Sequence, residues 1–430
     1  MDEYDVDDPE ELDQILQIDP IHPDRLAYDA ERGRRKHLLI LRRRRIRDFA
    51  DPFDVTFETF VRSYRLSQDL VFSLVDLIRP HVRRTSSPLA LPLEKKVLAA
   101  LSFFATGSYQ TPTGKNFEVS VAQPTMSNYI EEVTRALNTP EVVGRFIRFP
   151  ATAEEVDYCV QRNTMLGGQI SNTVAYTDGS LIKIRKPSVA NNRLAFMGRK
   201  SFASINVQIT CDRRMYVNNV LARFPGSTND SYIFNASALR RRMVELQDMR
   251  RCHLLGDSGY PLEPWMMTPF ARDETPEEGT PESRYNKAHC SDRSVVERCI
   301  GSMKEVFRAI NDERVLHYEA IKTCRFVVAI TVLHNLRILA QVPHFEEVQD
   351  PRARNGNGHN EDDDAEGGED GENDNGGAEG AAAVHNLMAR GAAPSSNGHP
   401  VGANVLFPPN KAKRAAPTSS QIDVQKQART

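Results

Sequence analysis

Apolar positions recur along the chain with two different periods, and the change between them predicts two kinds of structure. Residues 53–85 and 93–137 repeat apolar residues at helical spacing, which predicts an all-α region. Between about 172 and 260 the period shortens to two or to short apolar runs, which predicts strands at TVAYTDGSLIKI, FASINVQITCD, MYVNNVLARF and CHLLG. One helix before the last of these strands and two long helices after it complete a predicted α/β core.

The order of elements in the helical region favours a helix-turn-helix. A helix at about 93–105 is followed by a short helix at about 113–118 and a longer one at about 123–137. If the last helix lies in a major groove, polar residues near its start would contact DNA. These residues are Thr125, Ser127 and Asn128. Three-helix packing units that do not bind DNA show the same order, so both interpretations stay open.

Charge is distributed unevenly around a net value of −3. The stretch ERGRRKHLLILRRRRIRDF holds two basic clusters, typical of a nuclear import signal, a phosphate-binding arm or a solvated basic helix. Residues 361–380 hold ten acids and no base, so the remainder is basic and suits a polyanionic partner. A solvated acidic tail would have the same composition.

Four regions follow from these patterns. We predict an acidic and then basic arm at 1–50, a helical domain at 51–150 and an α/β domain at 165–340. The remaining region, 345–430, is poor in apolar residues and is predicted to be disordered.

The cysteines and the apolar runs indicate a soluble intracellular protein. Six cysteines include no C-x-x-C pair, which argues against a structural zinc site and a disulfide framework and favours a reducing compartment. The first residues are acidic, unlike a secretory signal. The longest apolar run, FVVAITVL at 326–333, is too short to span a bilayer, so we expect no membrane partner.

Two aspartates occupy unusual places on the predicted strands. Asp257 directly follows the apolar end of the fourth strand, where a turn or capping aspartate is the simpler explanation. Asp178 lies within the first strand among apolar residues, where a carboxylate is costly to bury unless it is paired or bound to a cation. If the fourth strand pairs beside the first, both carboxylates reach the same end of the sheet.

A third acid, Glu297, is expected to open the helix RSVVERCIGSMKEVFRAI. An acid that stabilises a helix start is the simpler explanation here. One apolar stripe of this helix should face the core: Val296, Ile300, Met303, Phe307 and Ile310. The neighbouring face should carry Glu297, Gly301, Lys304 and Arg308. On that face Glu297 would point into a cleft, Gly301 would leave room for a ligand, and the two cations would meet phosphate.

Together the three acids predict a metal site. Converging carboxylates repel each other unless a divalent ion sits among them, and oxygen ligands favour Mg²⁺ or Mn²⁺. Two such ions could clamp the attacking and leaving oxygens of a phosphodiester. No covalent protein intermediate is then needed.

Five ordered blocks of sequence resemble PIF/Harbinger transposases and the animal nuclease-like proteins derived from them. The blocks are AYTDGSLIKIRKP, FPGSTNDSYIF, LLGDSGYPLEPWMMTPF, RYNKAHCSDRSVVERCIGSMKEVFRAI and VLHNL. The resemblance implies an RNase H-like fold, with a mixed sheet flanked by helices, and an Asp-Asp-Glu metal site at Asp178, Asp257 and Glu297. It also implies a nuclear location, DNA cleavage or strand transfer, and a separate Myb-like DNA-binding partner.

Several positions qualify the resemblance. Ser180 and Leu181 stand where the family usually has Thr-His, and CIG replaces its usual Phe-Gly after the VVER motif. Asp230 matches a family acid and reads as a helix N-cap or, failing that, as a helper carboxylate. Two further residues match family positions beside the site without an assigned role, and one histidine is expected to be a satisfied core residue. These are His289 and Arg293, and then His334.

Three functions therefore compete. The first is a divalent-metal-dependent DNA endonuclease or transposase, and the second is a catalytically silent nuclear protein that binds DNA or protein. The third is an RNase H-like hydrolase that acts on RNA. A homo-oligomer is compatible with each of them.

Overall fold

The computed structural model of the protein describes residues 23–49, 51–83, 91–108, 121–188, 193–198, 202–270 and 276–343. The predicted helix at 113–118 and the predicted disordered tail lie outside these residues. The chain forms two compact units. Unit 1 comprises Met1–Ala136, Val306–Ala309 and Leu339–Arg390, and unit 2 comprises Leu137–Glu305, Ile310–Ile338 and Gly391–Thr430.

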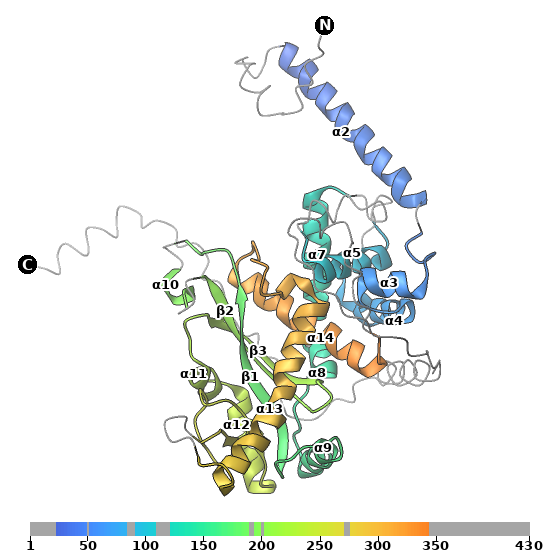
Figure 1. Cartoon of the computed structure of the whole chain (residues 1–430). Coiled ribbons are helices and arrows are strands. Elements are labelled where there is room, and N and C mark those ends of the chain that lie inside the picture. Colours follow the sequence, from blue (N-terminus) through green and yellow to red (C-terminus); the bar gives the residue numbers. More distant parts are fainter. Residues whose placement is uncertain are drawn as a thin grey trace, which may run out of the picture. The chain divides into compact units, whose positions relative to one another are not determined.

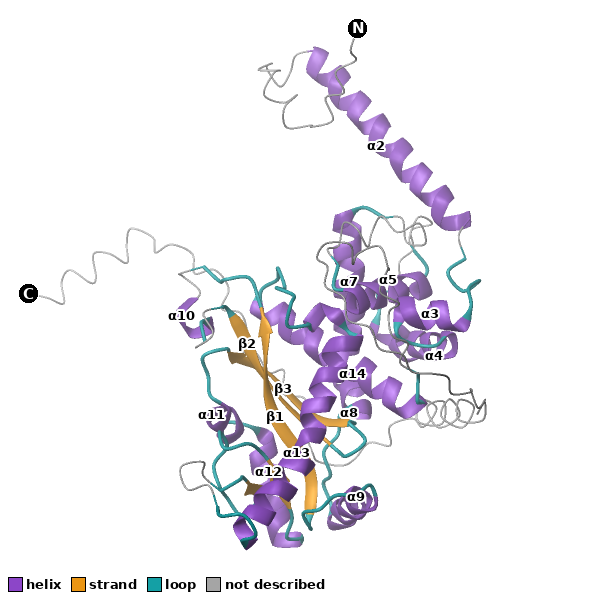
Figure 2. Ribbon diagram, in the orientation of Figure 1, coloured by secondary structure: helices purple, strands orange, loops and turns teal. Residues whose placement is uncertain are grey.

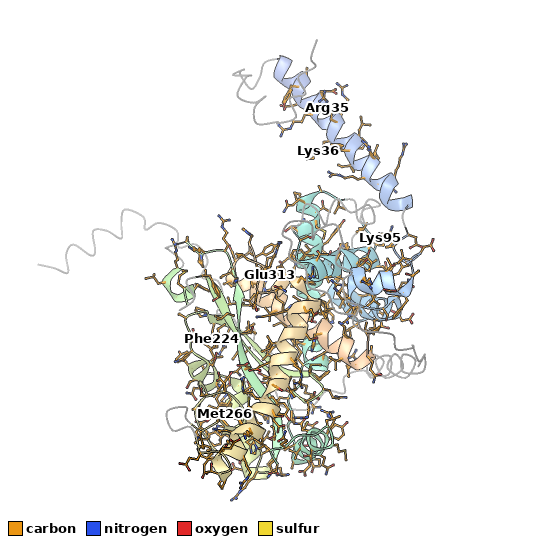
Figure 3. All side chains as sticks on the ribbon, viewed as in Figure 1. Arg35, Lys36, Lys95, Phe224, Met266 and Glu313 are labelled. Carbon is orange, nitrogen blue, oxygen red and sulfur yellow. The ribbon has the colours of Figure 1, made fainter. Side chains whose placement is uncertain are left out.

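Helix α2 (Pro23–Phe49), in unit 1, carries both basic clusters of the N-terminal arm. Between residues 31 and 42 every side chain on it is exposed. Arg35 and Lys36 project from it in Figure 3. Four consecutive apolar residues, Leu38–Leu41, are exposed as well. Charged and apolar residues are thus mixed around the circumference of α2. No single face of the helix is apolar enough to serve as a packing face.

The described residues of unit 1 that follow α2 are mainly helical, as predicted. The predicted helical segment at 53–85 forms two α-helices because Arg65 adopts a left-handed conformation (φ 64°) and Ser67 caps the next helix by accepting from the N–H of Leu70. The buried ion pair of Lys96 and Glu132, at 2.8 Å, joins two further helices. The elements are α3 (Phe57–Tyr64), α4 (Gln68–Ile78), η1 (Arg79–His81), α5 (Leu93–Thr106) and α7 (Gln123–Leu137).

Helix α7 begins close to the predicted position, and its buried face includes Met126 and Ile130. Thr125 and Ser127 are half-buried near its start, whereas Asn128 is exposed. Since the preceding residues 109–120 are not described, the helix-turn-helix stays a prediction.

Unit 2 contains a mixed five-stranded sheet in the order β3-β2-β1-β4-β5, which confirms the predicted α/β fold class (Figure 1). The strands are β1 (Thr173–Lys183), β2 (Ser204–Cys211), β3 (Val217–Pro225), β4 (His253–Leu255) and β5 (Met266–Met267). Strand β1 pairs antiparallel with β2 and parallel with β4. The four predicted strands are confirmed, and the two-residue β5 is an addition because it is too short to show a period.

Helices cover the sheet of unit 2 (Figure 2). They are α8 (Pro140–Phe146), α9 (Ala153–Met165), α10 (Arg193–Phe196), α11 (Asp230–Asn235), α12 (Ala238–Met249), α13 (Pro281–Val306) and α14 (Ala320–Ala340). The short helix η4 (Arg308–Ile310) follows α13, and its first two residues belong to unit 1. The single helix expected after β3 is in fact two helices, α11 and α12. Its continuity ends because Ser237 caps α12 by accepting from the N–H of Arg240.

Helices α13 and α11 pack on opposite faces of β1. Asp178 of β1 contacts α13, whereas the next residue, Gly179, lies against α11. Successive positions of a strand face opposite sides of the sheet, so the two helices enclose this strand from both sides.

Helix α14 is long and apolar enough to cross a membrane by length and composition, but 83% of its apolar window is buried inside the protein. The apolar run noted in the sequence is therefore the middle of a longer helix. Within the described structure this helix belongs to the core.

Candidate active site

The register of β1 and β4 brings Asp178 and Asp257 to the same end of the sheet. Tyr176 pairs with Leu255 in this parallel ladder, and each aspartate lies two residues beyond its paired strand position. Parallel neighbours run in the same direction, so both carboxylates lie just past the end of the β1–β4 ladder, Asp178 still within β1 and Asp257 after β4. The expected pairing of the first and fourth strands is confirmed.

Glu297 lies in the second half of α13, so the expectation that it opens a helix is wrong. The helix begins at Pro281. In its first three turns, polar residues occupy the buried positions Ser283, His289 and Asp292. The sequence there has no apolar repeat from which the start of the helix could be predicted. A helix-start role for Glu297 is thereby removed. All five residues of the predicted apolar stripe are buried, but only Val296, Ile300 and Met303 lie on α13, because the helix ends at Val306.

Arg293 brings Glu297 and Asp178 together. Its Nη1 atom donates to Oδ2 of Asp178 at 3.2 Å, and its Nη2 atom donates to Oε1 of Glu297 one turn along α13. Because both nitrogens belong to one guanidinium, the two carboxylates lie within reach of a single planar group. Asp178 is 18% exposed and Glu297 is 50% exposed, so the site opens toward solvent on the Glu297 side.

Electrostatic repulsion is concentrated on Asp178. Burial, together with the smaller effects of the nearby charges of Asp257 and Asp230, raises the pKa of its carboxyl to about 6. Two contacts act in the opposite direction: the Arg293 guanidinium and the N–H of Gly179, which donates to Oδ1 at 2.8 Å. A buried acid with surplus negative charge around it is a place where a further cation would be stabilised.

Asp230 occupies the space behind β1, and the expectation that it is a helix N-cap is wrong. Asn229 is the cap, because its side chain accepts from the N–H of Tyr232. Oδ1 of Asp230 accepts from Nδ2 of Asn206 at 2.9 Å, and a Cβ on Gly179 would collide with the same oxygen. The carboxylate therefore supports the strand directly beside Asp178 from the opposite face.

Lys304 and Arg308, expected beside Glu297 on one helix face, do not form that face in the structure. A Cβ on Gly301 would meet nothing within 4 Å, so there is open space beside that residue. Lys304 is only 13% exposed and pairs with Asp312 at 2.6 Å. Arg308 lies beyond the end of α13, in η4, so the expected continuous face ends at Lys304.

The two histidines singled out in the sequence are buried. Nε2 of His334 lies 2.8 Å from the carbonyl oxygen of Met215, which confirms a satisfied core histidine. Nε2 of His289 lies 3.2 Å from the carbonyl oxygen of Met267, and burial lowers the pKa of this imidazole. His289 stands one turn before Arg293 on α13 and so packs behind the acid site.

The donor chemistry of this site fits a hard divalent ion, whereas the present side-chain arrangement is closed around Arg293. Carboxylate oxygens are the ligands that Mg²⁺ and Mn²⁺ prefer. Within the described part of the chain, no three His, Cys, Asp or Glu side chains are already grouped to hold an ion. The three acids could hold a metal once the guanidinium leaves Asp178 and Glu297.

The part of the chain that holds this site matches known proteins in sequence. The family described as DDE superfamily endonuclease matches residues 177–335, a span that contains all three acids. The candidate nuclease HARBI1 of Bos taurus and that of Homo sapiens are each 31% identical over 287 residues, covering 66% of this chain and 79% of theirs.

A plant protein is a more distant relative. Protein ALP1-like of Arabidopsis thaliana is 24% identical over 300 residues, covering 66% of this chain and 70% of its own. No solved structure matches the chain. The identity and coverage of these relatives, together with the matched endonuclease span, show that the chain belongs to the Harbinger transposase-derived nuclease family of DDE superfamily endonucleases.

Proposed function

We propose that the protein is a divalent-metal-dependent DNA endonuclease or transposase whose catalytic residues are Asp178, Asp257 and Glu297. The observation that carries the proposal is the placement of the first two acids just past the end of the β1–β4 ladder, with the third held to Asp178 through a shared guanidinium. Membership of a nuclease family supports the same reaction class.

Each acid has a distinct part in this proposal. Asp178, on the central strand and 18% exposed, would hold the inner position, and burial raises the pKa of its carboxyl to about 6. Asp257 is oriented by the N–H of Gly259, which donates to its Oδ1 at 2.9 Å. Glu297 is half exposed and can turn toward an incoming strand. Two Mg²⁺ or Mn²⁺ ions held by these oxygens would stabilise the attacking and leaving oxygens of the phosphodiester during in-line displacement.

A second function, nuclear binding without catalysis, is favoured by a different feature. Helix α2 exposes two clusters of arginines, as expected of a group that neutralises phosphates or is read as an import signal.

For either function we propose that the protein works in the nucleus, with a Myb-like DNA-binding partner and as a homo-oligomer.

Cleavage of supercoiled plasmid and of terminal-repeat DNA in Mn²⁺ tests the proposal. The variants Asp178→Asn, Asp257→Asn and Glu297→Gln should each lose cleavage by roughly a thousandfold, since metal-assisted stabilisation is worth several kcal/mol. Glu282→Gln is the matched control, because Glu282 is exposed on the same helix at its other end. It should cleave normally.

Other outcomes would decide between the alternatives. Equal residual nicking by the wild type and all three acid variants would contradict the enzymatic proposal. DNA binding that falls steeply with salt but ignores EDTA would then favour the silent binding protein. Preferential cleavage of RNA would assign the site to an RNase H-like hydrolase.

A further inference from the structure

Arg293 is positioned as a counter-ion inside the acid site. Its guanidinium is 20% exposed and touches both a buried and a half-exposed carboxylate. Asp178 comes from the central strand and Glu297 from the same helix as Arg293, four residues on. An arginine at this spacing is normally a surface ion pair worth little, but here it also reaches across to the sheet.

The charge balance explains why a cation is needed there. Asp178 is only 18% exposed, shares the Arg293 guanidinium with Glu297, and has Asp230 on the other side of β1 next to Gly179. Without a positive group, the ionised form of Asp178 would be unfavourable beside two other acids. The guanidinium therefore meets the same electrostatic need that a divalent ion would meet.

The geometry of the acids also follows from Arg293. Glu297 is tied to this guanidinium instead of standing in a three-ligand group with the aspartates, and the described residues hold no such preformed group. A planar fork that donates to two carboxylates separates their oxygens by its own width, which differs from the close packing around a small ion.

We propose that Arg293 takes the place of the divalent cation in the metal-free protein, so that metal binding requires Arg293 to leave Asp178 and Glu297. The proposal rests on the metal site of the proposed function. It makes Arg293 a positioning residue that competes with the metal for the same oxygens. Metal affinity in the absence of DNA is therefore lower than the three acids alone would give.

Calorimetric titration of the full-length protein with MnCl₂, without DNA, tests the competition. Arg293→Gln should bind Mn²⁺ roughly fivefold more tightly than the wild type, since releasing a partly exposed ion pair is worth up to about 1 kcal/mol. Arg293→Lys should lie between them, because an ammonium is a point charge without a bidentate fork. Arg298→Gln is the matched control: Arg298 is exposed, donates to Oγ of Ser294, and should leave the affinity unchanged.

A second measurement guards against misfolding. Circular dichroism melting in EDTA should show a cooperative transition for every variant, with Arg293→Gln less stable than the wild type because the acids lose their counter-ion. Added Mn²⁺ should then raise the melting temperature of Arg293→Gln more than that of the wild type. If Arg293→Gln does not fold, the same comparison with Arg293→Lys decides the question.

The outcomes separate the two proposals. If Mn²⁺ binds in a manner abolished by Asp178→Asn, but equally or less tightly in Arg293→Gln, the competition is refuted and the metal site stands. If neither the wild type nor Arg293→Gln shows Mn²⁺ binding that depends on Asp178, both the competition and the proposed metal site are refuted.

Discussion

Two aspartates of unit 2, the fully buried Asp292 and the partly buried Asp178, are each paired with an arginine. The difference between them distinguishes a structural acid from a candidate catalytic one. Asp292 is fully buried and accepts from the backbone N–H groups of Gln169 and Ile170 and from Nη1 of Arg213 at 2.8 Å. Its oxygens are thus satisfied by the surrounding protein. Asp178 has one backbone donor and one guanidinium contact, and other acids lie nearby.

The contrast between Asp292 and Asp178 shows how a structural carboxylate differs from one that could bind a cation. A buried carboxylate that is saturated by fixed donors stabilises the fold, because removing it would leave those donors unpaired. A buried carboxylate that is under-neutralised by fixed donors is held in place at a cost, and a bound cation can offset that cost. Asp178 belongs to the second kind.

The largest expected effect is on the free energy of unfolding, and it tests whether Asp292 is the structural acid of the pair. Asp292→Ala should lower the free energy of unfolding by about 3–5 kcal/mol, since it removes a fully buried carboxylate that accepts from Nη1 of Arg213 and from the N–H groups of Gln169 and Ile170. Asp178→Asn should lower it little or not at all, because it removes a charge that burial disfavours. Urea unfolding in EDTA measures both. A larger loss for Asp178→Asn than for Asp292→Ala would reverse our assignment.

A medium effect is expected from the support behind Asp178. Gly179→Ala would push a methyl group against the carboxylate of Asp230 and should cost about 1–3 kcal/mol of stability. Adding Asp230→Ala should recover part of this loss, because the colliding group is gone. Unfolding measurements on a double-mutant cycle give the coupling energy. Strictly additive losses would show that Asp230 does not support the strand at Gly179.

The smallest expected effect concerns His253, whose imidazole is held in its neutral form in the folded protein. Burial, with a smaller contribution from His289, lowers the pKa of His253 to about 4. The unfolded imidazole takes up a proton near pH 6.5, so this contribution to stability is present above that pH and is lost as the pH falls toward 4. We expect a loss of roughly 1–2 kcal/mol across this window.

The variant His253→Gln isolates this contribution. Glutamine does not titrate and can still reach Oγ1 of Thr173, which lies 3.2 Å from Nε2 of the histidine. Unfolding free energies of both proteins in EDTA, measured from pH 7 to pH 4, should differ by an amount that changes with pH. The opposing contribution of Asp178 is common to both and cancels. Parallel curves would mean that His253 is not held neutral.

Much of the fold could be predicted from the sequence because it depends on local patterns. The alternation along β1, the short apolar run of β4 and the apolar stripe of α13 each mark an element. The position of Asp257 just after a short strand was therefore informative once the parallel pairing was assumed.

Other features depend on contacts that are distant in sequence. The buried positions in the first half of α13 are occupied by polar residues, so no apolar period marks the start of the helix. The pairing of Lys304 with Asp312 requires the turn after that helix, and the role of Asp230 requires the packing of α11 against β1. Arg293 and Glu297 stand four residues apart, a spacing that signals a helical ion pair, but its extension to Asp178 appears only in three dimensions.

The anchoring of Asp292 next to Arg293 has a mechanical consequence. Helix α13 is a single rod of 26 residues, about 39 Å long. It is pinned at Asp292 to the backbone that leads into β1, so rolling or sliding the rod would break those bonds. Glu297 must therefore reorient by turning about its own side-chain bonds, a motion of picoseconds to nanoseconds, rather than by a shift of the helix. Loading of the site should then be faster than any domain movement, and a slow phase after metal addition would have to originate elsewhere.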